Sequence, residues 1–152
     1  MASQEQLDKD WSQVPIPQSY ADLYANYGDP SSPTFETDYI TTVTATIADG
    51  SEVSVHCHVA AVASLEDIFA RCSDLVNEYN GCYVVRDVRG GTDPSIHSWG
   101  LAIDFNYDQF PLGSTARQDP RLLQAFADHN WFYGGDFRTR KDPNHWQRAG
   151  DF

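Results

Sequence analysis

The segment from Ser95 to Asn106, with the sequence SIHSWGLAIDFN, combines a histidine and an aspartate in a pattern that could bind a metal ion. Its second half is typical of a β-strand, in which alternate residues face opposite sides. Leu101, Ile103 and Phe105 then form the core-facing side, and the polar side consists of Ala102, Asp104 and Asn106. His97 precedes a bend at Gly100 that could turn it toward Asp104. Together they would make half of a metal site; the alternative is a surface histidine and a solvated aspartate.

A second candidate half-site lies near the C-terminus, in Asp142-Pro143-Asn144-His145-Trp146. Proline pushes the residue before it toward an extended conformation, and a tight turn here could bring Asp142 and His145 together. The pair Gly134-Gly135 would allow close approach of the backbone. Aromatic residues on both sides could wall off such a site. The alternative is a charged C-terminal loop with an Asp-Pro turn.

The elements that would position these residues follow from hydrophobic periodicity and turn signals. Residues 39–47 and 53–57 predict a β-hairpin around Asp49-Gly50, and apolar spacing over 59–79 predicts a long helix stopped by Asn80-Gly81. A second helix begins at Asp119-Pro120 and runs to about residue 130. Further short strands are expected at residues 83–85, 101–106, 131–133 and 145–147. Because strands and helices do not alternate regularly, we expect an α+β domain with a small, mainly antiparallel sheet and flanking helices.

The length of 152 residues predicts one globular unit. Gly28 to Pro33 is a Pro/Ser/Gly-rich stretch, and we expect it to separate an N-terminal arm, residues 1–33, from the main body, residues 34–152. In the arm, Ser19 is placed to cap a short helix that carries Tyr20 and Tyr27 and packs on the body.

Charge and composition exclude several classes of function. The net charge of −12 predicts repulsion from nucleic acid and from anionic membrane surfaces. Apolar runs are too short for a membrane span, and the polar, acidic N-terminus predicts no signal peptide. Three cysteines without a CxxC pair predict free thiols and synthesis in a reducing compartment.

Taken together, the two segments resemble a known family. Ser95-x-His97-x-x-Gly100-x-Ala102-x-Asp104, followed by Gly134-Gly135-Asp136-Phe137 and by Asp142-x-x-His145-Trp146, is similar to the zinc peptidases that cut peptidoglycan stem peptides. That family includes D-alanyl-D-alanine carboxypeptidases and dipeptidases and the L-alanyl-D-glutamate endopeptidases used as phage endolysins. Its fold and zinc site are shared with the Hedgehog signalling domain. The resemblance is strong from about residue 83 to 147 and weaker from 20 to 80.

The resemblance implies a Zn²⁺ ion held by His97, Asp104 and His145, with Asp142 as the general base. Two neutral imidazoles and one carboxylate would leave the ion an open fourth position. Many relatives carry glutamate where this chain has Asp142, whose side chain is one methylene shorter. Peptidases of the HExxH type are excluded because the chain lacks that motif.

Three further roles follow from the same resemblance. Ser95 would hold substrate through its hydroxyl, and Arg86 would stabilise the developing oxyanion. Asp136 would orient a ligand histidine. Without the resemblance, Arg86 is equally a surface ion-pair partner and Asp136 equally a structural cap.

Two other histidine positions predict structural roles. In His56-Cys57-His58 the two histidines face one side of a strand and the cysteine the other, which is poor geometry for a shared metal. His129 near a helix end is expected to act as a C-terminal capping charge.

The leading hypothesis is therefore a monomeric zinc metallopeptidase that degrades peptidoglycan, of phage-lysin type. It would be made in the cytoplasm and would reach the cell wall after release or with a virion. We favour an internal bond such as L-alanyl-D-glutamate over D-alanyl-D-alanine. The alternatives are a non-catalytic zinc-binding module and a virion structural protein that retains the fold.

Overall fold

The expected β-hairpin is present in the computed structural model, which describes residues 2–152. Strands β1 (Ile40–Thr46) and β2 (Glu52–His58) pair antiparallel, with Val43 opposite Val55. The turn between them uses Gly50 at φ +85°, a conformation that glycine adopts without steric cost. The hairpin prediction is therefore confirmed.

A second sheet, of four strands, contains the candidate ligands Asp104 and His145. Its strand order is β3-β4-β6-β5, and all neighbours are antiparallel. The strands are β3 (Tyr79–Gly81), β4 (Ala102–Phe105), β5 (Phe132–Tyr133) and β6 (His145–Gln147). Two small antiparallel sheets with separate helices are consistent with the expected α+β class.

Five α-helices accompany the sheets in the described part of the chain. They are α1 (Gln4–Asp8), α2 (Tyr20–Tyr27), α3 (Phe35–Tyr39), α4 (Val62–Cys72) and α5 (Pro120–Ala127). Helix α2 begins as expected, because the Asp22 amide donates to Ser19 Oγ at 3.1 Å. Helix α5 is capped by Asp119, whose carboxylate accepts from the Arg121 amide at 2.9 Å. No helix among residues 2–152 is both long and apolar enough to cross a membrane.

The long helix expected after the hairpin is shorter than the sequence predicted. The helix expected over residues 59–79 ends at Cys72 and is preceded and followed by 3₁₀ turns. The amides of Asn77 and Glu78 donate to the Asn106 side chain at 2.8 and 3.0 Å, so this stretch leaves the helix for β3. The apolar spacing continues through Val76 to Tyr79 because both side chains pack on the core from outside the helix.

Residues 83–85 do not form the expected strand. Val84 and Val85 are 43% and 61% exposed, and the Val84 amide donates to the His97 carbonyl at 3.0 Å. This stretch instead supports the turn that carries His97. Asn106 also differs from expectation, because it is buried at φ +62° rather than lying on an open face.

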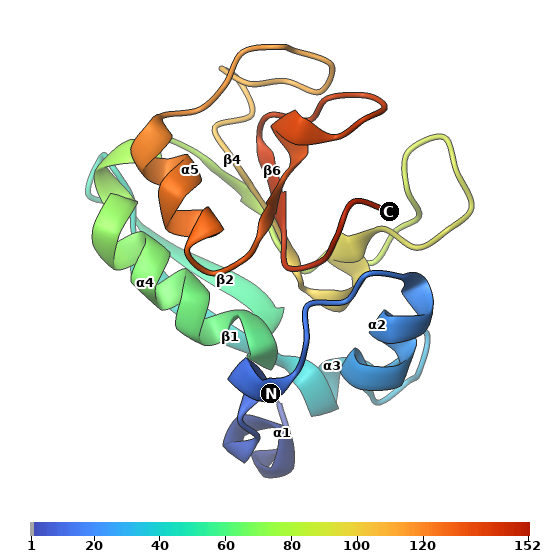
Figure 1. Ribbon diagram of the computed structural model, residues 1–152. Helices are drawn as coiled ribbons and strands as arrows, with labels where there is room; N and C mark the ends of the chain where they lie inside the picture. The colour runs from blue at the N-terminus through green and yellow to red at the C-terminus, as the bar shows by residue number, and fades with distance from the viewer. Residues whose placement is uncertain (1) are drawn as a thin grey trace.

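The main core lies between the sheets and helices α4 and α5, which pack side by side in Figure 1. Trp146 of β6 stacks on Phe126 of α5 with ring centroids 4.3 Å apart. Successive strand residues face opposite sides, so the burial of Trp146 and Ile103 among the core residues turns Asp104 and His145 away from the helices. Core packing thus aims the polar pair at the loops on the other side of the sheet.

The N-terminal segment packs against the end of this sheet. Arg148 follows β6, is buried, and donates hydrogen bonds to the Tyr27 hydroxyl and the Trp11 carbonyl. The Gly150 amide donates to the Pro17 carbonyl at 2.8 Å, and the Tyr20 hydroxyl donates to the Pro94 carbonyl at 2.8 Å. These contacts join residues 11–27 to both segments that carry candidate ligands.

Candidate metal centre

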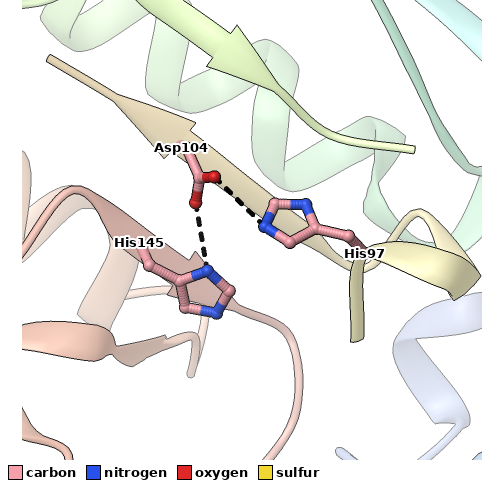
Figure 2. A group of neighbouring side chains, drawn as sticks. All are labelled: His97, Asp104 and His145. Atoms are coloured by element: carbon pink, nitrogen blue, oxygen red, sulfur yellow. Dashed lines mark hydrogen bonds and ion pairs between the residues drawn. The ribbon is translucent and has the colours of Figure 1, made fainter. Parts of the chain in front are cut away.

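His97, Asp104 and His145 converge in the structure (Figure 2). Asp104 on β4 and His145 on β6 are direct cross-strand partners, and such pairs have neighbouring side chains. His97 comes from the 3₁₀ helix Ile96–Trp99, immediately before β4. One candidate ligand atom from each residue lies within 4.8 Å of the other two. The two half-sites recognised in the sequence are therefore one cluster.

The bend that brings His97 to the cluster depends on Gly100. This residue has φ +70°, and a Cβ atom there would lie 2.6 Å from the His58 backbone nitrogen. Ser95 begins the turn, because its Oγ accepts the His97 amide hydrogen at 3.3 Å. A larger residue at position 100 would push this turn away from β2.

One ring nitrogen of each histidine already has a partner. His97 Nδ1 lies 2.7 Å from the Cys82 carbonyl oxygen, and His145 Nε2 lies 2.8 Å from Gln147 Oε1. Both partners are acceptors, so these nitrogens carry the hydrogens and the opposite nitrogens keep their lone pairs. The free atoms are His97 Nε2 and His145 Nδ1, which face the two oxygens of Asp104.

The distances within the cluster and its unpartnered ring nitrogen both fit a metal ion. His145 Nδ1 is 3.0 Å from Asp104 Oδ1, and His97 Nε2 is 3.2 Å from Oδ2. His97 Nε2 is nevertheless buried without a partner at hydrogen-bonding geometry. An orphaned imidazole nitrogen beside a carboxylate, with both rings oriented by acceptors, is an arrangement that can hold a metal ion.

The electrostatics of the cluster favour charge on the carboxylate. Burial alone would raise the pKa of Asp104, but the adjacent imidazoles of His145 and His97 outweigh it when they are protonated and hold that pKa well below its ordinary value. Burial likewise opposes protonation of His145, yet the hydrogen bond and charge of Asp104, with Asp142 nearby, raise its pKa. The site thus stabilises positive charge between its side chains.

Asp142 reaches the same region through the predicted turn. The His145 amide donates to the Asp142 carbonyl at 3.0 Å, and the Asp142 amide donates to the Gly134 carbonyl at 2.9 Å. A Cβ atom on Gly134 would lie 2.4 Å from the Asp142 carbonyl oxygen, so the close approach expected for this glycine pair is present. Burial raises the pKa of Asp142, bringing it nearer the range of an effective general base.

A cavity of about 870 Å³ opens over the cluster. His97, Asp104, His145 and Asp142 line it, together with Ser95 and Arg86. The Ser95 hydroxyl is partly engaged as the helix cap, and the Arg86 backbone is held by the Ser95 amide and the Ser98 hydroxyl. The Arg86 side chain donates to the Asp87 carbonyl at 3.2 Å and otherwise borders the cavity.

Asp136 is not brought to the cluster. Its carboxylate pairs with Arg117 at 2.7 Å and lines a separate cavity of about 320 Å³ beside α5. The orienting role that the resemblance implies for it is filled by Gln147 and by the Cys82 carbonyl. Gln147 was not among the predicted site residues, although its position two residues after His145 on a strand places both on one face.

The other histidines have structural surroundings. His58 is fully buried, and its Nδ1 accepts the Ala60 amide hydrogen at 3.0 Å, so it caps the 3₁₀ turn Val59–Ala61. His129 Nε2 contacts Asp67 Oδ2 at 2.7 Å, so its partner is a carboxylate on α4 rather than the end of its own helix. Cys57, Cys72 and Cys82 are free and buried, as the cysteine count predicted.

The comparisons with known proteins point the same way as the geometry. Residues 89–148 match a family model described as D-alanyl-D-alanine carboxypeptidase, over fewer than half of the 152 residues. The search of curated proteins and the search of solved structures found no match. The matched stretch contains the three clustered residues, Asp142 and Ser95, and Arg86 lies just before it. The match supports a relation to this broad family, and with it a hydrolase of the peptidase class.

Proposed function

We propose that the protein is a zinc metallopeptidase that hydrolyses peptidoglycan stem peptides and has the fold of the Hedgehog domain and its peptidase relatives. The observation that carries this proposal is the convergence of His97, Asp104 and His145 beside Asp142 in one cavity, inside the stretch that matches the peptidase family. Two neutral imidazoles and a carboxylate form a ligand set that suits Zn²⁺ and leaves a coordination position open.

The chain's own residues then have distinct tasks. When bound, Zn²⁺ supplies Lewis acidity, which polarises a peptide carbonyl and makes water more acidic. Asp142 takes a proton from the attacking water and later delivers it to the leaving amine, a task that its raised pKa supports. Arg86 stabilises negative charge on the carbonyl oxygen, and Ser95 holds the substrate. Gln147 keeps His145 in the tautomer whose Nδ1 is free.

The cleaved bond is L-alanyl-D-glutamate or a similar internal bond, with D-alanyl-D-alanine as the alternative. The decisive experiment offers a stem pentapeptide ending in D-Ala-D-Ala beside intact peptidoglycan and identifies the products by mass spectrometry. New N-terminal D-glutamate or D-isoglutamine is expected. Free D-alanine as the main product would assign a carboxypeptidase, and no product from either substrate would refute the proposed activity.

A non-catalytic zinc module is a second candidate, and Asp142 argues against it, because a structural metal site needs no half-buried carboxylate with a raised pKa at its edge. A virion structural protein that merely retains the fold would show neither zinc nor hydrolysis. Zinc content and hydrolysis, measured on one preparation, separate all three candidates.

The remaining parts of the proposal concern the whole chain. We place its action at the bacterial cell wall, after release or delivery there as a lysin or virion component. The arm of residues 1–33 and the body of residues 34–152 act as one unit, which the hydrogen bonds of Arg148 to Tyr27 and Trp11 support. The protein works as a monomer and binds neither nucleic acid nor membrane; light scattering tests the first statement.

A further inference from the structure

The distribution of charge around the cavity differs from that of the rest of the protein. Four of the ten Lys and Arg residues line the large cavity, against four of the 22 Asp and Glu residues. These are Arg86, Arg89, Arg138 and Arg140, and Asp93, Asp104, Asp142 and Asp151. The cavity therefore has no net formal charge, and the whole net charge of −12 lies on the rest of the protein. A bound divalent cation would make the cavity positive.

The arginines outside this cavity have carboxylate partners or a buried structural role. Arg71 pairs with Asp67 and Asp128, and Arg121 pairs with Asp74 at 3.0 Å. Arg117 pairs with Asp136, and Arg148 is buried against the N-terminal segment. Three of these four guanidinium groups are therefore neutralised by neighbouring carboxylates, and the fourth is held inside the fold.

Two of the four arginines that line the cavity have a partner within the protein, and two do not. Arg138 lies 3.5 Å from Asp151, and the Arg86 side chain donates to a backbone carbonyl. Arg89 and Arg140 form no ion pair within residues 2–152. In a chain with more than twice as many acidic as basic residues, two unpaired guanidinium groups that border the same cavity are well placed for an anionic ligand.

The two unpaired arginines belong to loops far apart in sequence. Arg89 is on the loop that the Val88 amide closes onto the Asp93 carbonyl at 2.8 Å. Arg140 is on the loop between Phe137 and Asp142, where Lys141 Nζ donates to the Phe137 carbonyl at 2.5 Å. In Figure 1 both loops project on the side of the molecule that also holds the C-terminus, away from α4. Both arginines line the large cavity, as do His97, Asp104 and His145 of the candidate metal centre.

The two candidate bonds share one chemical feature. In L-alanyl-γ-D-glutamate and in terminal D-alanyl-D-alanine, the residue whose amine leaves carries a free α-carboxylate. Amidation of D-glutamate to D-isoglutamine removes that charge without changing the bond that is cut. Guanidinium groups bind carboxylates through paired, charge-assisted hydrogen bonds and have little affinity for a primary amide.

We propose that Arg89 and Arg140 make this cavity selective for substrates with a free carboxylate on the residue whose amine leaves. The inference rests on the proposed peptidase function and extends it to a substrate class: D-glutamate stem peptides are preferred over their D-isoglutamine counterparts. The same role would explain why Arg89 and Arg140 have no carboxylate partner in a protein that is otherwise acidic.

The test compares two stem peptides that differ in amidation of the D-glutamate α-carboxylate and in nothing else. The zinc-loaded protein is expected to show at least about fivefold higher kcat/KM for the acid at low salt, a modest ratio because both arginines are exposed. The ratio is expected to shrink as salt rises from about 0.01 M to about 1 M, where the Debye length falls from roughly 30 Å to roughly 3 Å. Equal cleavage of both peptides at low salt would overturn the inference.

Variants identify the groups responsible. The double variant Arg89→Gln/Arg140→Gln is expected to cleave both peptides at similar rates. Arg121→Gln removes one positive charge on the far α5 surface and is expected to keep the preference. A preference that survives in the double variant, or disappears in Arg121→Gln as well, would contradict the assignment.

A binding measurement separates this inference from the proposed activity. Calorimetry on the zinc-loaded protein with Asp142→Asn measures the affinity of both peptides without turnover. If the unsubstituted protein cleaves neither peptide, the proposed activity on them fails, yet tighter binding of the acid peptide would still support the arginine assignment. Equal or absent binding of the two peptides would overturn it.

Discussion

Two regions of the molecule bury histidines, and they do so in opposite ways. His58 lies among Trp11, Tyr27 and Tyr39, with ring centroids 4.9–5.5 Å from its own. Its Nδ1 accepts the Ala60 amide hydrogen, and its Nε2 donates to the Tyr27 carbonyl at 3.1 Å. Both nitrogens are used by the backbone, and burial lowers the pKa of His58 to about 3.

In the candidate metal centre each histidine has one acceptor partner, the Cys82 carbonyl for His97 and the Gln147 side chain for His145, and its other ring nitrogen faces Asp104. His97 is as buried as many core residues, at 2% exposure, so burial does not distinguish it from His58. The difference is the carboxylate that faces the second nitrogen. A buried histidine with two neutral backbone partners is a structural element, and one that keeps a lone pair free beside a carboxylate is equipped to bind a cation.

The largest effect that tests this comparison is loss of the metal. His97→Ala and Asp104→Asn are each expected to lower zinc content far below one equivalent, because each removes one of three ligands. Elemental analysis of the purified variants measures this, and a chelator should abolish hydrolysis until Zn²⁺ is restored. His129→Ala is the matched control, since that histidine contacts Asp67 outside the cluster. Full zinc in His97→Ala would disprove the ligand assignment.

The next effect separates ligand from base at the same site. Asp142→Asn is expected to keep its zinc and to lose roughly 10²–10⁴-fold in rate, because an amide cannot accept the proton from water. Asp136→Asn serves as control, because the Asp136 carboxylate pairs with Arg117 in another cavity. Loss of zinc together with rate in Asp142→Asn would make it a ligand. Near-normal turnover with zinc intact would assign the proton transfer to another group.

The sequence predicted the parts of this site that depend on local rules. Strand alternation put Asp104 on the opposite side from Ile103, the Asp-Pro turn joined Asp142 to His145, and Ser19 marked the start of α2. These follow from backbone geometry over a few residues. That the two half-sites form one cluster was inferred only through the family resemblance, and the pairing of β4 with β6, which brings them together, was not predicted.

Features that depend on distant partners were missed. The helix after β2 was predicted too long because buried Val76 continues its apolar spacing. In the structure the amides of Asn77 and Glu78 donate to the Asn106 side chain instead of continuing the helix. The family resemblance implied that Asp136 orients a ligand histidine, yet Arg117, 19 residues away, holds its carboxylate. Local patterns do not encode which distant side chain competes for a hydrogen bond.

The pH dependence of stability sharpens the comparison from the side of His58. Its pKa is lowered from 6.5 to about 3 in the folded protein, so the unfolded chain binds the additional proton between these values. The neutral, buried state of His58 therefore contributes to the free energy of unfolding fully above pH 6.5, and this contribution is lost as pH falls toward 3. Between pH 7 and 4 the free energy of unfolding decreases by roughly 3 kcal/mol from this group. Denaturant unfolding at several pH values measures it. His58→Gln should lower stability at pH 7 and flatten the slope below pH 6.5; an unchanged slope would contradict the burial argument.

The smallest expected effect concerns the residue that orients a ligand. The ring nitrogen of His97 that faces away from Asp104 has a backbone carbonyl as its partner, which mutation of a side chain cannot remove. The corresponding nitrogen of His145 has the Gln147 side chain as its partner. Loss of such an orienting partner typically weakens metal binding roughly 10–100-fold, because the imidazole can then rotate or change tautomer. Gln147→Ala should show this loss in competition with a chelating dye while keeping its fold by circular dichroism.

Gln147→Glu retains an acceptor and should recover most of the affinity, and Gln124→Ala, on the exposed face of α5, should not change it. Zinc affinity in Gln147→Ala equal to that of the unsubstituted protein would mean that Asp104 alone orients His145.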